Sequence, residues 1–197
     1  MVAMSAEYRI KSKHKTNPDA CVKDGKSAVR WVRANAAKYG IDPNRVAAGG
    51  GSAGGHVAAT TGTATKIVEE GEDTSVSSWP NALVLFNPVL DNGPSGYGHS
   101  RVKDYWKDFS PMHNVTKDTP PSIFFLGSKD KLIPVATGEK WKKLVADQGK
   151  KSELHVWEGQ PHGFFNHGKT KGPNGGPVFN EILAKMDAFL KGIGFLD

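Results

Sequence analysis

Cysteine is nearly absent from this sequence of 197 residues, because Cys21 is its only representative. A single cysteine cannot form an internal disulfide, and it cannot build a metal cluster from several thiolates. Cys21 could act as a nucleophile only beside a base. Its position at the entry to a predicted helix favours a packed or half-exposed thiol instead.

Long hydrophobic runs are also missing. No apolar stretch approaches the roughly 18–20 residues that a membrane-spanning helix needs. The first nine residues lack the charged and then apolar order of a secretory signal peptide. For the chain as it stands, we therefore expect a cytoplasmic protein without a membrane partner.

The composition is that of a globular protein, with 38% apolar and 23% charged residues. The length fits one domain over residues 1–197, and the Gly/Pro-rich stretch 168–177 is interpreted as a surface loop. The net charge of +6 could attract nucleic acid. The lysines are scattered, however, and no aromatic–basic alternation joins them, so we interpret them as a solvated surface and expect no nucleic-acid partner.

Strand-like and helix-like patterns alternate along the chain. The predicted strands cover residues 2–9, 45–49, 82–86, 122–126 and 152–157, and the predicted helices cover about 19–38, 53–68, 134–148 and 178–190. Strands that alternate with helices of ten or more residues are typical of parallel β-α-β units. The sequence thus predicts an α/β fold with a predominantly parallel sheet flanked by helices.

The segment Gly50-x-Ser52-x-Gly54 matches the turn that carries the nucleophile of many serine hydrolases. This turn holds the serine in a strained conformation between a strand and a helix, and side chains two positions to either side are expected to collide. The Ala53 N–H would then point towards the oxyanion of a tetrahedral intermediate. A phosphate-binding loop is disfavoured, because the Lys-Ser/Thr of a P-loop is missing.

A serine nucleophile needs a histidine base, and His162 is the best candidate. It lies in a tight loop directly after the predicted strand 152–157. His155 lies within that strand, and His56 is expected to pack near the site rather than to act in catalysis. The remaining histidines are expected in polar loops: His14, His99, His113 and His167.

Asp130 is the best candidate for the carboxylate that orients the histidine. It follows the predicted strand 122–126, and the loops at the carboxyl ends of parallel strands gather site residues. The order serine, aspartate, histidine is also the one expected for this type of site. Among the alternatives, Glu158 is too close to the histidine in sequence and Asp147 lies on a helix face. Asp91 also follows a strand and is the main rival.

Several segments together resemble a known family. They are Tyr8–Arg9, Ala28–Val32, Gly40–Ala47, Gly50–His56, Gly127–Asp130 and Pro161–Phe164. The chain resembles the hormone-sensitive-lipase-like branch of the α/β-hydrolases, which includes many acetyl esterases. The resemblance covers most of the chain. It implies hydrolysis of carboxylic esters with short acyl chains, a small-molecule ester substrate, and neither cofactor nor metal.

One feature of that family is missing. Its members carry a His-Gly-Gly segment, which supplies part of the oxyanion hole, and no such segment precedes Ser52. Residues 1–9 resemble the family's fourth strand, and the resemblance therefore implies a domain that is shortened at its N-terminus and lacks strands one to three. The fourth strand could pair with the fifth, another chain could complete the sheet, or the fold could be compromised. An exposed edge favours association, so we expect a homodimer.

Other functions remain open at this point. Loss of one oxyanion donor weakens catalysis roughly a hundred- to a thousandfold, so the chain could be a weak or inactive hydrolase fragment. The same three residues could also serve a peptidase or a thioesterase.

Overall fold

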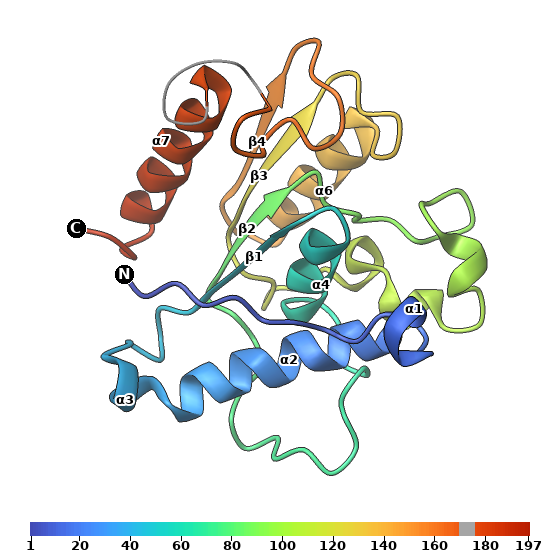
Figure 1. Cartoon of the computed structure of the whole chain (residues 1–197), viewed down its shortest axis with the longest axis vertical. Coiled ribbons are helices and arrows are strands. Elements are labelled where there is room, and N and C mark those ends of the chain that lie inside the picture. Colours follow the sequence, from blue (N-terminus) through green and yellow to red (C-terminus); the bar gives the residue numbers. More distant parts are fainter. Residues whose placement is uncertain (170–175) are drawn as a thin grey trace.

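The computed structural model describes residues 1–169 and 176–197, so part of the predicted loop 168–177 lies outside the described residues. Its centre is a sheet of four strands in the order β1-β2-β3-β4 (Figure 1). The strands are β1 (Ala47–Gly51), β2 (Ala82–Phe86), β3 (Ser122–Gly127) and β4 (Ser152–Trp157). All three neighbouring pairs are parallel. The predicted α/β class is confirmed.

Helices cover both faces of this sheet (Figure 1). The α-helices are α1 (Lys11–His14), α2 (Asp19–Ala34), α3 (Ala36–Tyr39), α4 (Ala53–Thr61), α5 (Trp106–Phe109), α6 (Val135–Asp147) and α7 (Pro177–Gly192), and two 3₁₀ turns are η1 (His99–Arg101) and η2 (Pro111–Asn114). Helices α4 and α6 pack on one face, α2 packs on α4, and α7 covers the other face. None of the described helices is long and apolar enough to cross a membrane.

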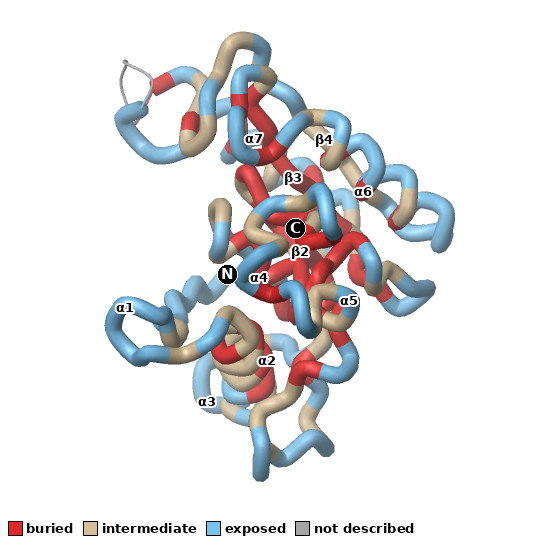
Figure 2. Tube along the Cα trace, turned by 90° about the vertical axis from the view of Figure 1, so that its right-hand side faces the viewer, coloured by how far each residue is buried: buried red, intermediate tan, exposed pale blue. Residues whose placement is uncertain are grey.

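Alternation along the strands divides the core into two parts. Leu83 and Leu85 of β2 pack with α4 and α6, whereas Val84 between them packs against α7. Successive side chains of a strand point to opposite faces, so a strand covered on both sides is apolar at every position. The buried residues concentrate in β2, β3 and α4 (Figure 2).

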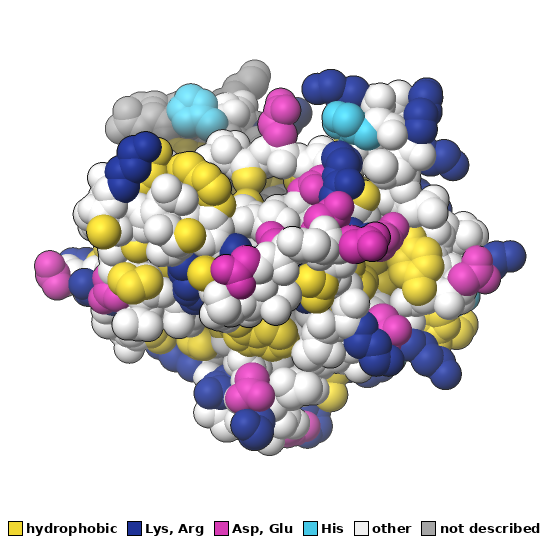
Figure 3. Space-filling model, turned by 90° about the horizontal axis from the view of Figure 1, so that it is seen from below, with side chains coloured by type: hydrophobic (Ala, Val, Ile, Leu, Met, Phe, Trp, Pro, Cys, Tyr) yellow, Lys and Arg dark blue, Asp and Glu magenta, His cyan; other side chains and the backbone are white. Residues whose placement is uncertain are grey.

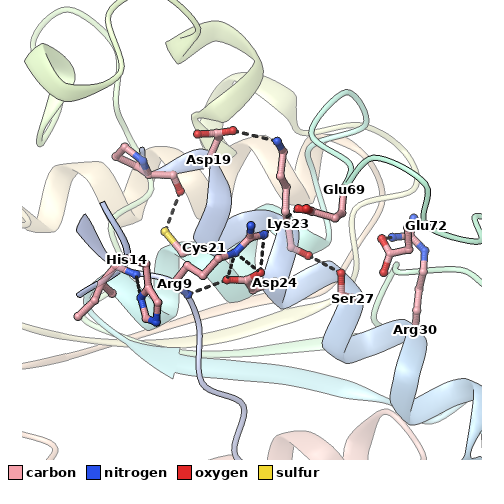
Figure 4. A network of polar contacts seen from close by, with 12 residues as sticks. Arg9, His14, Asp19, Cys21, Lys23, Asp24, Ser27, Arg30, Glu69 and Glu72 are labelled. Carbon is pink, nitrogen blue, oxygen red and sulfur yellow. Dashed lines mark hydrogen bonds and ion pairs between the residues drawn. The ribbon is translucent and has the colours of Figure 1, made fainter. Parts of the chain in front are cut away.

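One predicted helix is interrupted, and another ends earlier than expected. The helix over 19–38 breaks at Asn35, and the helix over 53–68 stops at Thr61. The chain after α4 is instead held by side chains of α2. Lys26 donates to the Ala64 carbonyl, and Arg30 Nε donates to the Val76 carbonyl at 3.0 Å. Figure 4 shows the accompanying contact between Arg30 and Glu72.

The predicted strand over residues 2–9 is wrong, because this segment pairs with no strand. It runs along α2 and is fixed there through Arg9 (Figures 1 and 4). The Arg9 backbone N–H donates to Asp24 at 2.6 Å, and its guanidinium lies 2.7 Å from both Asp24 and Glu69. Burial alone would raise the pKa of Asp24, but the bonds from Arg9 hold this pKa below its ordinary value.

A groove of about 720 Å³ lies between this N-terminal segment, α2 and β1. Direct pairing of the N-terminal segment with β1, the first outcome considered from the sequence, therefore does not occur. The helices and the four strands nevertheless form two packed core layers, so the gap beside β1 leaves the rest of the fold ordered.

Candidate active site

Ser52 occupies the turn between β1 and α4. Its φ of 54° and ψ of −114° lie in a region that non-glycine residues rarely adopt. The Ser52 N–H donates to the Phe86 carbonyl at 2.8 Å, and the His56 N–H donates to the Ser52 carbonyl at 3.0 Å. The ladder to β2 and the first turn of α4 together hold this backbone, as expected for a nucleophile turn.

The glycines around Ser52 differ in how closely they are packed. A Cβ added to Gly50 would lie 2.6 Å from the Gly54 carbonyl carbon, and one added to Gly55 would lie 2.9 Å from the Gly50 oxygen. At Gly54, in contrast, an added Cβ meets nothing within 4 Å. The expected collision occurs at Gly50 but not at Gly54, because Gly54 faces the groove beside β1. Gly55, which sequence reasoning did not single out, carries the second steric constraint.

Asp130 and His162 form a hydrogen-bonded pair after β3 and β4. His162 Nδ1 lies 2.7 Å from Asp130 Oδ2. The other carboxylate oxygen, Oδ1, accepts the N–H groups of Leu132 at 2.8 Å and Ile133 at 3.0 Å. The Asp130 side chain is fully buried, whereas a quarter of the His162 side chain is exposed. A carboxylate fixed in this way holds the His162 imidazole ring through Nδ1, which leaves Nε2 available for proton transfer.

Asn87 is a site residue that sequence reasoning missed. Its side-chain amide donates to Asp130 Oδ2 at 2.9 Å, and its carbonyl oxygen accepts the Gly163 N–H at 3.2 Å. Its φ of 42° is a left-handed conformation, which asparagine tolerates better than most residues. The available signal was the Asn-Pro step that closes β2, because it lies at the same sheet edge as Asp130 and His162.

The three predicted triad residues all lie at the carboxyl edge of the parallel sheet. Ser52 follows β1, Asp130 follows β3 and His162 follows β4. Asp130 and His162 are in direct contact, but no hydrogen bond within residues 1–169 and 176–197 joins the Ser52 side chain to His162. Ser52 and His162 therefore lie at the same edge of the sheet, but among the described residues their side chains share no hydrogen bond.

The rival acids have other partners. Asp91 Oδ1 accepts the Gly93 N–H at 2.7 Å and lies 3.9 Å from His113 Nδ1. Asp147 forms an ion pair with Lys143 at 2.8 Å on the surface of α6. These contacts leave Asp130 as the acid that meets His162.

A small pocket of about 110 Å³ lies beside the nucleophile turn, and Ala53, His56 and Phe109 form part of its wall. The His56 ring is buried and stacks against Phe109, with 4.3 Å between the ring centroids. Burial lowers the pKa of His56 to about 4, although hydrogen bonds to Asn92 and to the Phe109 backbone act in the opposite direction. His56 is thus a neutral packing residue near the site, as the sequence indicated.

Residues suited to hold a metal do not converge here. Within the described part of the chain, no three His, Cys, Asp or Glu side chains are placed to bind one ion. Cys21 is half-buried and directs its thiol to the Pro18 carbonyl, and burial raises its pKa. A half-buried thiol of this kind is what we expect of a residue that serves packing.

The comparisons with known proteins point to esterases. The family model described as BD-FAE matches residues 1–94. Esterase LipC of Mycobacterium tuberculosis is 30% identical over 214 residues, which cover 96% of this chain and 53% of LipC. The chain therefore spans about half the length of this curated relative.

Solved structures match the same share of this chain and a larger share of the related protein. Thermogutta terrifontis esterase 2 phosphoramylated by tabun is 40% identical, with a TM-score of 0.88 over 96% of this chain and 70% of that one. The same esterase with propionate bound is 38% identical, with a TM-score of 0.87 over 96% and 71%. With the parallel sheet, the strained serine turn and the Asp–His pair already in place, this similarity shows that the chain belongs to the α/β-hydrolase esterases.

Proposed function

We propose that this chain hydrolyses carboxylic esters with short acyl groups by transferring the acyl group to Ser52. The observation that carries the proposal is the Asp130–His162 pair at 2.7 Å, on the same sheet edge as a serine with φ of 54°. A base oriented by a buried carboxylate, on the same sheet edge as a nucleophile turn, is the arrangement that acyl transfer requires.

In the proposed mechanism, His162 Nε2 takes the proton from the Ser52 hydroxyl as the oxygen attacks the ester carbonyl. Asp130 holds the ring through Nδ1 and stabilises the imidazolium that forms. The protonated ring then gives its proton to the leaving alcohol. Water attacks the acyl-enzyme with His162 again as base, which releases the acid and restores Ser52.

The Ala53 N–H is the proposed oxyanion donor. It lies at the start of α4, where unpaired backbone N–H groups and the helix dipole favour a negative charge. The sequence offers no His-Gly-Gly segment before Ser52, so the second donor is unassigned. An oxyanion hole with one donor fewer weakens catalysis roughly a hundred- to a thousandfold.

The pocket beside Ala53 supports a preference for short acyl groups. Its volume of about 110 Å³ leaves little space beyond a few carbon atoms, and its wall is mostly apolar, with His56, Asn92 and Arg101 among the polar members. One related structure is described with propionate bound. A weak or inactive hydrolase, or a peptidase or thioesterase with the same three residues, is the alternative.

Hydrolysis of p-nitrophenyl acetate, butyrate and octanoate tests this proposal. Wild-type protein should turn over the acetate and the butyrate faster than the octanoate, and Ser52→Ala should remove the activity while Ser100→Ala, an exposed serine, keeps it. Labelling by an organophosphate should follow the same pattern. A folded wild-type protein that neither hydrolyses these esters nor is labelled would contradict the proposal and favour an inactive fragment. The homodimer expected from the sequence stays a prediction, which sedimentation velocity tests.

A further inference from the structure

The pocket beside Ala53 has one charged side chain among the described residues of its wall, and that side chain is Arg101. No Asp or Glu belongs to this wall. His56 is neutral at ordinary pH because burial lowers its pKa to about 4, and burial raises the pKa of the Cys21 thiol. The pocket therefore has a mostly apolar lining and a single fixed charge, which is positive.

The charged end of Arg101, and not only its aliphatic stem, lies at the pocket. The guanidinium carbon Cζ is 5.5 Å from the centroid of the Tyr97 ring. A Cβ added to Gly98 would lie 3.9 Å from the same carbon. Tyr97 and Gly98 both belong to the pocket wall, and Tyr97 is 37% exposed. The positive charge is thus placed where the pocket meets solvent.

Arg101 differs from the other arginines of the chain in having no oxygen partner. Four guanidinium groups donate hydrogen bonds to protein oxygen atoms, namely those of Arg9, Arg30, Arg33 and Arg45. Within residues 1–169 and 176–197, the Arg101 side chain forms neither a hydrogen bond nor an ion pair. A guanidinium over an aromatic ring keeps its in-plane N–H groups available, and their geometry matches a carboxylate.

The loop that carries Arg101 is tied to the helix of the nucleophile turn through Asn92. Asn92 Oδ1 lies 3.0 Å from His56 Nε2 of α4, and Asn92 Nδ2 donates to the Tyr97 carbonyl at 2.9 Å. The Asn92 carbonyl oxygen lies 2.9 Å from His99 Nδ1 at the start of η1. Asn92 is buried, so these bonds fix the position of the Arg101 loop relative to α4.

The proposed mechanism determines which part of an ester enters this pocket. The leaving oxygen must face His162, because it receives its proton from that ring. The described wall of the pocket contains no residue of the loops after β3 and β4, which carry Asp130 and His162. The acyl chain lies on the other side of the ester carbonyl from the leaving oxygen. It is therefore the acyl chain that extends from Ser52 into the pocket, towards Arg101.

We propose that Arg101 selects esters whose short acyl chain ends in a carboxylate, which are hemiesters of short dicarboxylic acids. The carboxylate accepts the N–H groups of Arg101 where the pocket meets solvent, and the methylene groups lie along the apolar wall between Arg101 and Ala53. This inference rests on the proposed esterase function and names its substrate class. Because Arg101 is exposed, the bound carboxylate keeps part of its hydration, and its effect on selectivity is moderate.

Monomethyl succinate and methyl butyrate provide the test, because their acyl chains have equal length and differ in the terminal carboxylate, which is ionised at neutral pH. Wild-type protein should have the higher kcat/KM for monomethyl succinate, measured by release of methanol. Arg101→Gln should lower the ratio of the two kcat/KM values by about three- to thirtyfold. Arg101→Lys, which keeps the charge, should retain part of the preference, and high salt should reduce it.

Lys103→Gln is the matched control, because it removes an exposed positive charge that lies outside the pocket wall. This variant should keep the wild-type ratio. A binding measurement accompanies the kinetics and needs no turnover. In Ser52→Ala, which leaves the ester intact, monomethyl succinate should shift the Arg101 Nε–H resonance in an NMR titration, whereas methyl butyrate should not.

The outcomes separate this inference from the proposed function. Hydrolysis of methyl butyrate with a ratio that Arg101→Gln leaves unchanged overturns the inference and leaves the esterase function in place. A folded wild-type protein that hydrolyses neither ester contradicts the esterase function, and the titration of Ser52→Ala then decides the role of Arg101. A shift with monomethyl succinate alone supports a carboxylate site there, and the absence of a shift overturns it.

Discussion

The side-chain amide of Asn87 donates to Asp130 Oδ2 at 2.9 Å, the same oxygen that lies 2.7 Å from His162 Nδ1. One carboxylate oxygen thus contacts both Asn87, which directly follows β2, and His162, which lies in the loop after β4. Because Asn87 also accepts the Gly163 N–H, it fixes the acid loop and the histidine loop relative to each other. This bridge is the most direct structural support for the Asp–His pair.

Asn87→Ala should lower both activity and stability. It removes a donor to a fully buried carboxylate and places alanine at a φ of 42°. An unpaired buried group costs about 1–3 kcal/mol, so we expect kcat/KM to fall by about five- to a hundredfold. Ester hydrolysis and urea unfolding measure the two effects. Asn44→Ala, at an exposed position, is the control, and an Asn87→Ala variant with wild-type kcat/KM would show that Asp130 is oriented without it.

Two glycine variants test the uneven packing of the serine turn. Gly50→Ala should destabilise the protein by about 1–3 kcal/mol, because its Cβ would lie 2.6 Å from the Gly54 backbone. Gly54→Ala should be neutral or slightly stabilising, because alanine favours a helix and meets no neighbour. Urea unfolding of both variants provides the comparison. Similar losses from the two substitutions would show that the groove beside Gly54 is filled in solution.

His56 should make the folded state sensitive to mild acid. Burial holds its pKa at about 4, below the ordinary value of 6.5. Between these two values the unfolded chain binds a proton that the folded chain does not. Stability should therefore fall as the pH decreases from about 6.5 towards 4. Chemical unfolding at several pH values measures this slope.

The matched variant for this experiment is His56→Gln, which removes the titrating group and keeps a polar side chain near Asn92. Its free energy of unfolding should depend less on pH in the same window. His167→Gln, at an exposed position, should retain the wild-type slope. A slope shared by the wild type and His56→Gln would assign the acid sensitivity to other groups.

Charged side chains of both signs are mixed on the surface of the molecule. On the face shown in Figure 3, Lys and Arg side chains are interspersed with Asp and Glu, and no extended basic patch is visible.

The sequence by itself determined the order of the four observed strands and of helices α2, α4, α6 and α7, and it supplied the candidates Ser52, Asp130 and His162. Alternating apolar patterns indicate which residues are buried, and β2 and β4 begin and end at the predicted residues. The glycines around the serine specify a local turn. Loops that follow parallel strands meet at one edge, so the position of a residue after a strand placed the acid and the histidine together.

Only the tertiary structure decided the role of Asn87 and the fate of the N-terminal segment. Residues 2–9 have a strand-like pattern, but strand pairing requires a neighbour, and Arg9 instead binds Asp24 and Glu69. Glu69 is distant in sequence, and local periodicity contains no information about it. The same reason explains the groove and the open space at Gly54, because both depend on which chain segments come to lie beside β1.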